Sequence, residues 1–160
     1  MIDPPQVVQT DRQITAVIHL TVLRSEIQSV MGPAIQEVMK AVFAQGIGPI
    51  GPVFSHHFRM DPEVFDFEVG VPVMTSATAI GRVQPGELPA AVVARTTYHG
   101  PYEGLGAAWG EFGDWIAAHG QKPATNLWEY YVAGPESSPD PSTWRTELNR
   151  PLLPKDSSAA

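Results

Sequence analysis

Two stretches of the chain carry apolar residues at intervals of four, three and four positions, the spacing of one face of an α-helix. They are Met31, Ile35, Val38 and Val42 in the first stretch, and Leu105, Trp109, Phe112 and Ile116 in the second. Each stretch ends at a glycine, Gly46 or Gly120, as helices often do. The pattern predicts two amphipathic helices, in which Pro33 fits only near the first turn or at a kink.

β-Branched and aromatic residues bounded by turn residues mark six candidate strands. They cover residues 14–22, 52–59, 65–71, 90–98, 126–133 and 144–149. Each predicted helix falls between the first and second strand of a set of three, so the chain reads as two βαββ units. The link between the units, residues 75–88, either stays a loop or adds strand pairing of its own.

The two units are related by a nearly constant shift along the sequence. A shift of 74 positions superposes the helical stripes and lays residues 16–20 over 90–94. It also pairs Gly46 with Gly120, Pro49 with Pro123, and Phe54 with Trp128. In the closing strands the shift is 79, which aligns Glu68 with Glu147 and puts five extra residues in the loop 134–142. The repeat indicates a duplication, with copies at about 14–73 and 88–152.

Two βαββ units in about one domain length predict an α+β fold of the SHS2 type with pseudo-twofold symmetry. We expect a curved antiparallel sheet, two main helices on one side of it, and a ligand cleft where the related halves meet. Residues 1–12 are expected to form a lead-in, 13–153 a single domain, and 154–160 a polar tail.

Composition narrows the function classes. The net charge of −7 has the wrong sign for binding nucleic acid phosphates, and the ten basic residues are scattered. The absence of cysteine excludes disulfides and thiolate chemistry. Neither a signal peptide nor an apolar run of the roughly 20 residues that span a membrane is present. We therefore expect a cytoplasmic protein that binds no nucleic acid and no membrane.

The segment 126–134, NLWEYYVAG, places a carboxylate among large apolar groups. Burying an ionised carboxyl is costly unless it is paired, so Glu129 faces either water or a cavity that a ligand fills. In a strand Leu127, Glu129 and Tyr131 share one face, while Trp128 and Tyr130 share the other. Both faces carry large apolar groups. An acid ringed by Trp and Tyr favours flat organic cations.

Repeat geometry adds further candidates to the lining of this cleft. They are Tyr98, His99 and Tyr102 at one rim, Trp109 on the second helix, Phe54, His57 and Glu68 from the first half, and Glu147 on the closing strand. Several have a plainer interpretation. Trp109 suits core packing, Glu147 suits an exposed strand position, and His99 could simply cap a strand end.

Other motifs are rejected on their context. The glycines of GIGPIG, residues 46–51, follow a helix and enter a strand, whereas a dinucleotide fingerprint follows a strand and opens a helix. The adjacent His56 and His57 project to opposite faces of a strand, and no metal-ligand spacing appears. We expect no cofactor and no metal.

Three stretches, YHGPYEGLGAAWGEFGDWIAAHG, NLWEYYVAGP and WRTELNRPL, together resemble the GyrI-like superfamily over roughly residues 12–152. These small-molecule-binding domains also occur at the C-termini of AraC- and MerR-type multidrug-responsive regulators. The resemblance implies a central pocket for bulky aromatic, often cationic, compounds, with Glu129 as the pocket glutamate and Tyr131 beside it. Only about a dozen residues precede the first predicted strand, so we expect a stand-alone binder.

The resemblance also leaves two alternatives open. Some stand-alone relatives are implicated as hydrolases that open the cyclopropane ring of DNA-alkylating natural products. In that case Glu129 is the acid/base, Tyr130 or Tyr131 a proton-bearing helper, and Trp128 and Trp109 stack on the substrate. The other alternative is a protein inhibitor of an enzyme such as DNA gyrase, with which an acidic surface is compatible.

Overall fold

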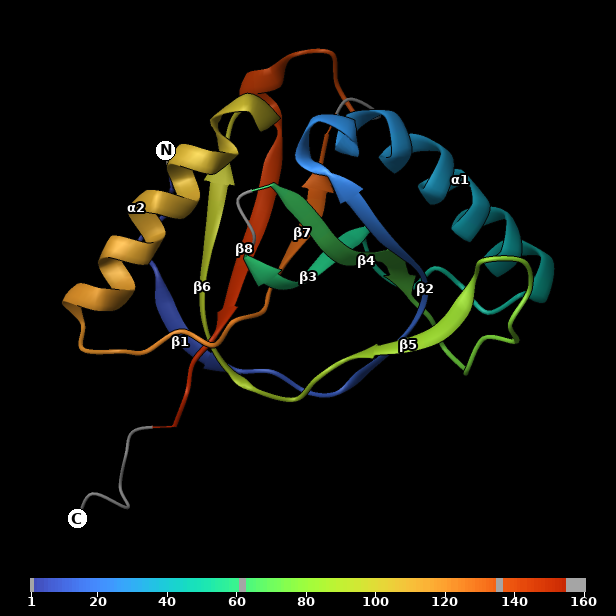
Figure 1. Ribbon diagram of the computed structural model, residues 1–160, viewed down its shortest axis with the longest axis horizontal. Helices are drawn as coiled ribbons and strands as arrows, with labels where there is room; N and C mark the ends of the chain where they lie inside the picture. Colours follow the sequence, from blue (N-terminus) through green and yellow to red (C-terminus); the bar gives the residue numbers. More distant parts are fainter. Residues whose placement is uncertain (1, 61–62, 135–136, 155–160) are drawn as a thin grey trace. The chain divides into compact units, whose positions relative to one another are not determined.

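The predicted βαββ pattern is present twice in the computed structural model, which describes residues 2–60, 63–134 and 137–154 (Figure 1). Two units are distinguished. The N-terminal unit is Asp11–Ala90, and the C-terminal unit joins Met1–Thr10 to Ala91–Ala160. Antiparallel strands and helices confirm the α+β class. The pseudo-twofold axis and the central cleft, which depend on how the units are placed, stay predictions.

The N-terminal unit is an antiparallel sheet with one long helix. Its elements are β2 (Gln13–Leu23), the short helix η1 (Arg24–Glu26), α1 (Ile27–Gln45), β3 (Phe54–Met60), β4 (Val64–Pro72) and β5 (Gln84–Leu88). The strand order is β3-β4-β2-β5. The helix α1 ends at Gly46, whose φ of 66° lies in the left-handed region that glycine adopts without strain. Pro33 lies inside α1, beyond its first turn.

The C-terminal unit repeats this arrangement. Its elements are β1 (Gln6–Gln9), β6 (Val92–His99), η2 (Tyr102–Gly104), α2 (Leu105–Ala118), β7 (Leu127–Ala133), η3 (Pro141–Thr143) and β8 (Arg145–Pro151). The strand order is β1-β6-β8-β7, the counterpart of β5-β2-β4-β3 read from the other edge. The duplicated topology that the sequence predicts is therefore present.

The edge strands β1 and β5 are exchanged between the repeats, which the sequence did not predict. Strand β1 lies in the lead-in before the first repeat, yet it pairs with β6 of the second repeat. Strand β5 lies in the link before the second repeat and pairs with β2 of the first. The segment that precedes each repeat thus completes the sheet of the other, and the link 75–88 does add strand pairing.

The strand registers correct one part of the repeat alignment. Thr15 lies opposite Pro72 and Val93 lies opposite Pro151, so the first strands are related by a shift of 93 − 15 = 78, not 74. Residues 16–20 therefore correspond to 94–98. The difference arises in the helices, since α1 has 19 residues directly before Gly46, whereas α2 has 14 and is separated from Gly120 by His119, which leaves the second repeat four residues shorter. Four residues are about one helical turn, so both shifts superpose the apolar stripes.

Each helix packs its apolar stripe on its own sheet. On α2 the buried residues are Ala108, Phe112 and Ile116, which meet Ala94 and Leu148 of the sheet. On α1, Val38 and Val42 play the same part against strands β2 and β4. Fully burying one such side chain contributes about 1.5–3 kcal/mol. Among the described residues, neither helix has the length and apolarity that crossing a bilayer demands.

Candidate functional site

The side chain of Glu129 projects from β7 toward α2. In the β7–β8 register, Glu129 lies opposite Leu148, a member of the core cluster beneath α2. Directly opposite strand residues share a face of the sheet, so Glu129 lies on the α2 side. There the indole N–H of Trp109 donates a hydrogen bond to its carboxylate. The two residues most in question from the sequence are therefore in contact.

The carboxylate of Glu129 is buried, and one of its two oxygen atoms lacks a hydrogen-bond partner among the described residues. Its residue is 8% exposed, and the Oε2 atom has no hydrogen-bond partner among the described residues. Burial raises the pKa of Glu129 to about 7, and the bond from Trp109 opposes that rise. Near neutral pH the group is thus divided between its charged and neutral forms, with one oxygen left for another partner.

Aromatic rings gather on the same side of the C-terminal unit. Tyr131 lies two residues from Glu129 on one face of β7, and Tyr102 of η2 meets its ring edge-on, with centroids 5.9 Å apart. Tyr102 also contacts Trp144, at 5.2 Å. Tyr131, Tyr102, Trp144 and Trp109 are each only partly buried. Each of these residues thus keeps some solvent-accessible surface.

Sequence reasoning missed two residues of this region. Trp144 stands immediately before β8, and its indole donates to the carbonyl of Ser138 at 2.9 Å. Thr146 is fully buried on β8, opposite Tyr131, and its hydroxyl has no hydrogen-bond partner among the described residues. The alternation along WRTEL could have placed Thr146 on the opposite face from Glu147, but not beside Glu129.

Tyr98 supports the site and has little surface for a ligand. It is 5% exposed, and its hydroxyl donates to the carbonyl of Pro101 at 2.8 Å. A Cβ at Gly104 would lie 2.1 Å from that hydroxyl oxygen, and one at Gly100 would lie 2.9 Å from it. The glycines of YHGPYEG therefore make room for the Tyr98 ring, which fixes the turn that carries Tyr102.

Three predicted site residues lie on the opposite face of the sheet from Glu129. These residues are Trp128, Tyr130 and Glu147. Trp128 and Tyr130 are the direct neighbours of Glu129 along β7, so their side chains point to the other face. Glu147 of β8 lies opposite Tyr130, and on its other side opposite Thr97 of β6. Burial and the charge of Glu147 raise the pKa of Tyr130 to about 12. This corrects the grouping expected from the sequence, because Trp128, Tyr130 and Glu147 cannot share a lining with Glu129 within this sheet.

The opposite face holds a polar network of its own. Arg95 donates to Asn149 at 2.7 Å and lies 3.2 Å from Glu147, and Asn149 donates to Glu147 at 3.2 Å. Glu147 is thus paired within the protein. His99, the neighbour of Tyr98 on β6, pairs with Asp3 at 3.0 Å. These contacts give both residues a structural explanation.

The N-terminal unit carries a neutral polar pair where the C-terminal unit has its acid. The shift of 74 places Ser55 at the position of Glu129 and His57 at that of Tyr131. The Nε2 atom of His57 lies 3.1 Å from the Ser55 hydroxyl, and its ring stacks on Phe67 at 4.9 Å. Burial, with His56 and Arg24, lowers the pKa of His57 to about 4. His57 is therefore uncharged at neutral pH.

The other predicted residues of the N-terminal unit lie on the far face of β3 and β4. Phe54 is fully buried opposite Gly70. Glu68 lies opposite both His19 and His56, and burial raises its pKa against the charge of His19. His57 faces α1 with Phe67, whereas Phe54 and Glu68 do not.

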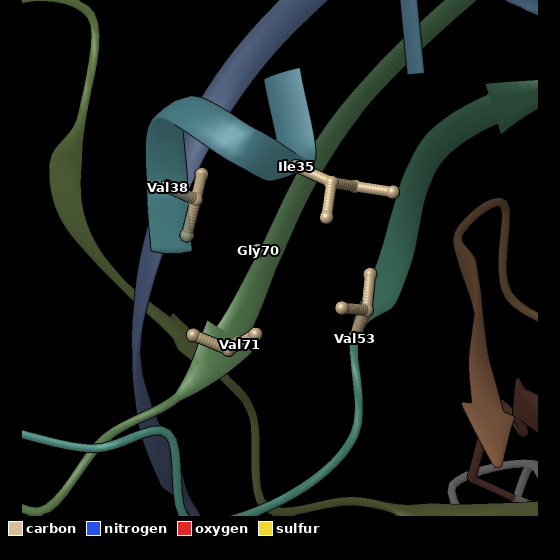
Figure 2. Close-up of a pocket in the computed structure, with 5 residues that line it drawn as sticks. All are labelled: Ile35, Val38, Val53, Gly70 and Val71. Atoms are coloured by element: carbon tan, nitrogen blue, oxygen red, sulfur yellow. The ribbon is translucent and has the colours of Figure 1, made fainter. Parts of the chain in front are cut away.

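Figure 2 shows an apolar crevice beside α1. It encloses about 120 Å³ of empty space, partly open to solvent, and is too narrow to admit a water molecule. It is lined by Ile35, Val38, Val53, Gly70 and Val71, none of which can bind a charge. The apolar lining of this crevice does not suit a ligand of Glu129, so we assign the crevice to imperfect packing.

The described residues hold no group of three or more His, Asp or Glu able to bind a metal.

A family model described as the GyrI-like small molecule binding domain matches residues 3–152 of the chain. No curated protein sequence matches the chain.

Solved structures with similar folds include a domain of EcmrR, EcmrR in a complex with DNA, and a protein bound to tetraphenylphosphonium. The C-terminal domain of EcmrR has a TM-score of 0.79 and 20% identity, covering 94% of this chain and 97% of that domain. EcmrR in a complex with DNA gives 0.81 and 21%, covering 93% of this chain but 57% of that one. The chain thus spans little more than half of that protein. SAV2435 bound to tetraphenylphosphonium gives 0.66 and 13%, covering 95% of each chain.

A hydrolase from Listeria innocua has a TM-score of 0.59 and 12% identity, covering 93% of this chain and 91% of that one. At these identities the similarity to solved structures is one of fold.

Proposed function

The chain belongs to the GyrI-like small-molecule-binding family, and on that premise we propose that it binds bulky aromatic, often cationic, compounds at Glu129. The observation that carries the proposal is the buried carboxylate with one oxygen unpartnered among the described residues. A buried acid that lacks a partner in its own protein costs stability, and such costs are retained mainly where a ligand uses them.

The charge of the ligand follows from the donors already present. The Trp109 indole supplies one hydrogen bond to Glu129 but no positive charge. On the same face of β8 the nearest base is Arg150, and its guanidinium donates to the carbonyl of Ala124 at 2.8 Å. A cationic ligand therefore supplies the counter-charge that the protein does not, in surroundings where water screens it poorly.

The rings around Glu129 determine the shape of the ligand. Tyr131, Tyr102 and Trp109 present partly exposed aromatic surface on the α2 side. Aromatic faces attract cations and stack on flat molecules, with each favourable contact contributing about 0.5–2 kcal/mol. Several rings around one acid select size and aromaticity without selecting a particular compound. This is what a binder of many related toxic compounds requires.

A matched pair of ligands and variants tests the proposal. Tetraphenylphosphonium carries a permanent charge, while triphenylphosphine oxide has similar rings and none. Tryptophan quenching should report binding of the cation to the wild-type protein. Glu129→Gln should weaken it by about tenfold or more, since a desolvated charge pair exceeds about 1.4 kcal/mol, and should leave the neutral compound within about twofold. Equal affinity of wild type and Glu129→Gln for the cation would reject the proposal.

A second candidate function uses the same carboxyl in catalysis. A pKa of about 7 suits an acid/base group at neutral pH. We propose, as the alternative, a hydrolase that opens the cyclopropane ring of DNA-alkylating compounds. Glu129 would take a proton from a water molecule while the water oxygen bonds to a ring carbon and one carbon–carbon bond of the ring breaks. The released electron pair passes into the conjugated carbonyl of the drug, and the oxygen of that carbonyl then takes up the proton. Of the two tyrosines expected as helpers, Tyr131 shares a face with Glu129 and Tyr130 does not.

Mass spectrometry separates binding from hydrolysis. The protein is incubated with a cyclopropane-bearing alkylator, and a product heavier by one water is sought. Turnover that is lost in Glu129→Gln and kept in Tyr130→Phe supports the hydrolase. Unchanged alkylator after prolonged incubation with wild-type protein excludes that activity and leaves the binder.

A further inference from the structure

We infer that Thr146 is the second polar anchor of the Glu129 site. Its hydroxyl and the carboxylate of Glu129 together hold one small polar group, which is a water molecule in the unliganded protein. The protein places two oxygen atoms on one face of the sheet and gives neither a partner among its described residues.

The burial of both atoms requires a partner for each. Thr146 is 0% exposed and Glu129 is 8% exposed, so bulk water reaches neither oxygen freely. Buried polar side-chain atoms nearly always have a hydrogen-bond partner, and buried waters commonly provide it where the protein does not. Two such atoms close together therefore indicate a shared partner.

The strand register places the two residues side by side. Tyr131 lies opposite Thr146, and Glu129 lies opposite Leu148, so Glu129 and Thr146 are diagonal neighbours on the α2 face. Positions on such a diagonal lie roughly 7–8 Å apart at the Cα atoms. The glutamate side chain spans part of that distance, and two hydrogen bonds of about 2.8 Å through one oxygen span the rest.

A water molecule suits both protonation states of the carboxyl. When Glu129 is ionised, the water donates to Oε2 and accepts from the Thr146 hydroxyl. When Glu129 is protonated, both hydrogen bonds reverse. This matches a carboxyl whose pKa burial raises to about 7.

Few charges compete for this position in the C-terminal unit. Arg150, which follows Thr146 and Leu148 on this face of β8, donates its guanidinium hydrogen bonds to the carbonyl of Ala124. The acidic side chains of η2 and α2 are exposed, namely Glu103, Glu111 and Asp114.

The second anchor has a consequence for ligand choice, which rests on the proposed function. A cation with an N–H or O–H group can displace the water and bond to both anchors. A cation without donors, such as tetraphenylphosphonium, receives only the charge of Glu129. Thr146 thereby favours aromatic cations that carry hydrogen-bond donors.

Two substitutions at Thr146 and one control test the inference without a ligand. Thr146→Val removes the hydroxyl at nearly constant volume, and Thr146→Ser keeps it. Thr15→Val is the matched control, because Thr15 is 1% exposed on β2 of the N-terminal unit and its hydroxyl also has no partner among the described residues. The pKa of Glu129 is followed by NMR of carboxyl-13C glutamate in each variant, with Glu129→Gln to assign the resonance.

Thr146→Val should raise the pKa of Glu129 by about one unit, because the hydrogen bond that the water donates to the charged carboxylate is stronger than the one that it accepts from the neutral acid. Thr146→Ser and Thr15→Val should leave it unchanged. A crystal structure of the unliganded wild-type protein should show a water within about 3.2 Å of both oxygens. An unchanged pKa in Thr146→Val, or a structure without that water, overturns the inference.

The ligand arm separates this inference from the proposed function. Proflavine, a flat cation with N–H donors, should bind Thr146→Val about three- to tenfold more weakly than wild type. Both ligands are titrated at pH 9, where Glu129 is ionised in about nine-tenths or more of the molecules of either protein. Under that condition tetraphenylphosphonium should bind wild type and Thr146→Val equally. Equal loss for the two ligands contradicts the second anchor. Failure of both ligands to bind wild-type protein, with the water present, rejects the proposed function and leaves the water site standing.

Discussion

Binding of a permanent cation should depend steeply on pH, because it competes with the proton for Glu129. The pKa of this carboxyl is raised to about 7 by burial. At pH 8 about nine-tenths of the molecules carry the charge, and at pH 5 about one-hundredth do. If only the ionised form binds, affinity for tetraphenylphosphonium should fall about 100-fold between pH 8 and pH 5, with a limiting slope of about tenfold per pH unit.

The magnitude of the charge interaction supports that assumption. Two unit charges about 4 Å apart interact by about 4 kcal/mol at an effective dielectric constant of about 20, which corresponds to roughly 1,000-fold in affinity. This exceeds the 100-fold set by proton competition, so residual binding to the neutral form should not flatten the curve over this range.

Isothermal titration calorimetry at half-unit pH intervals measures the effect. Proton uptake by the buffer, read from buffers of different ionisation enthalpy, should show release of up to one proton per cation bound below about pH 7. Triphenylphosphine oxide should show no such dependence, and Glu129→Gln should abolish it for the cation. A flat profile in wild-type protein, or an equal slope in Glu129→Gln, would refute the reasoning.

Three further predictions concern stability. Because burial raises the pKa of Glu129 from its ordinary value of 4.5 to about 7, the native state binds the extra proton and stability should fall as pH rises from about 4.5 to 7. Denaturant unfolding of Glu129→Gln should lack that loss of stability, which is about 3 kcal/mol for a pKa raised from 4.5 to about 7. Burial lowers the pKa of His57 to about 4, so stability should fall as pH drops from 6.5 to 4. His57→Phe should reduce that loss of stability in acid. An unchanged dependence of stability on pH between 6.5 and 4 in His57→Phe would contradict the prediction. Gly104→Ala should destabilise the protein because its Cβ would lie 2.1 Å from the Tyr98 hydroxyl oxygen, and Tyr98→Phe should restore part of the loss in the double variant. Strict additivity of those two substitutions would show that the contact is not the cause.

The helices and most strands could be predicted because their patterns are local. Period-3.6 stripes located α1 and α2, and β-branched runs located six strands. The edge strands β1 and β5 were not among the six predicted strands. β1 is only four residues long and β5 contains Pro85 and Gly86, so neither has the sequence pattern typical of a strand. The predicted shift of 74 for the first strands was wrong because apolar residues recur once per helical turn. Moving one helix sequence along the other by four residues, about one turn, aligns the apolar residues equally well, so their pattern cannot show that α1 is longer than α2.

The sequence singles out Glu129 as a candidate, but it does not identify the side chains that lie beside it. Glu129 stood out because a carboxylate in an aromatic strand has few explanations, and alternation correctly grouped it with Tyr131. Alternation also separates it from Trp128 and Tyr130, yet the sequence could not say which face meets α2. That requires the pairing of β7 with β8, which places Leu148 and Thr146 beside Glu129. The role of Tyr98 likewise depends on its contact with Gly104.

The most direct test of the central claim is a crystal structure of the protein with tetraphenylphosphonium. The account predicts the phosphonium on the α2 side of β7, with a phenyl ring against Trp109 or Tyr131 and the Glu129 carboxylate as the nearest anionic group. A cation bound instead beside Glu147 on the other face of the sheet, with the Glu129 carboxylate still enclosed by protein, would contradict it.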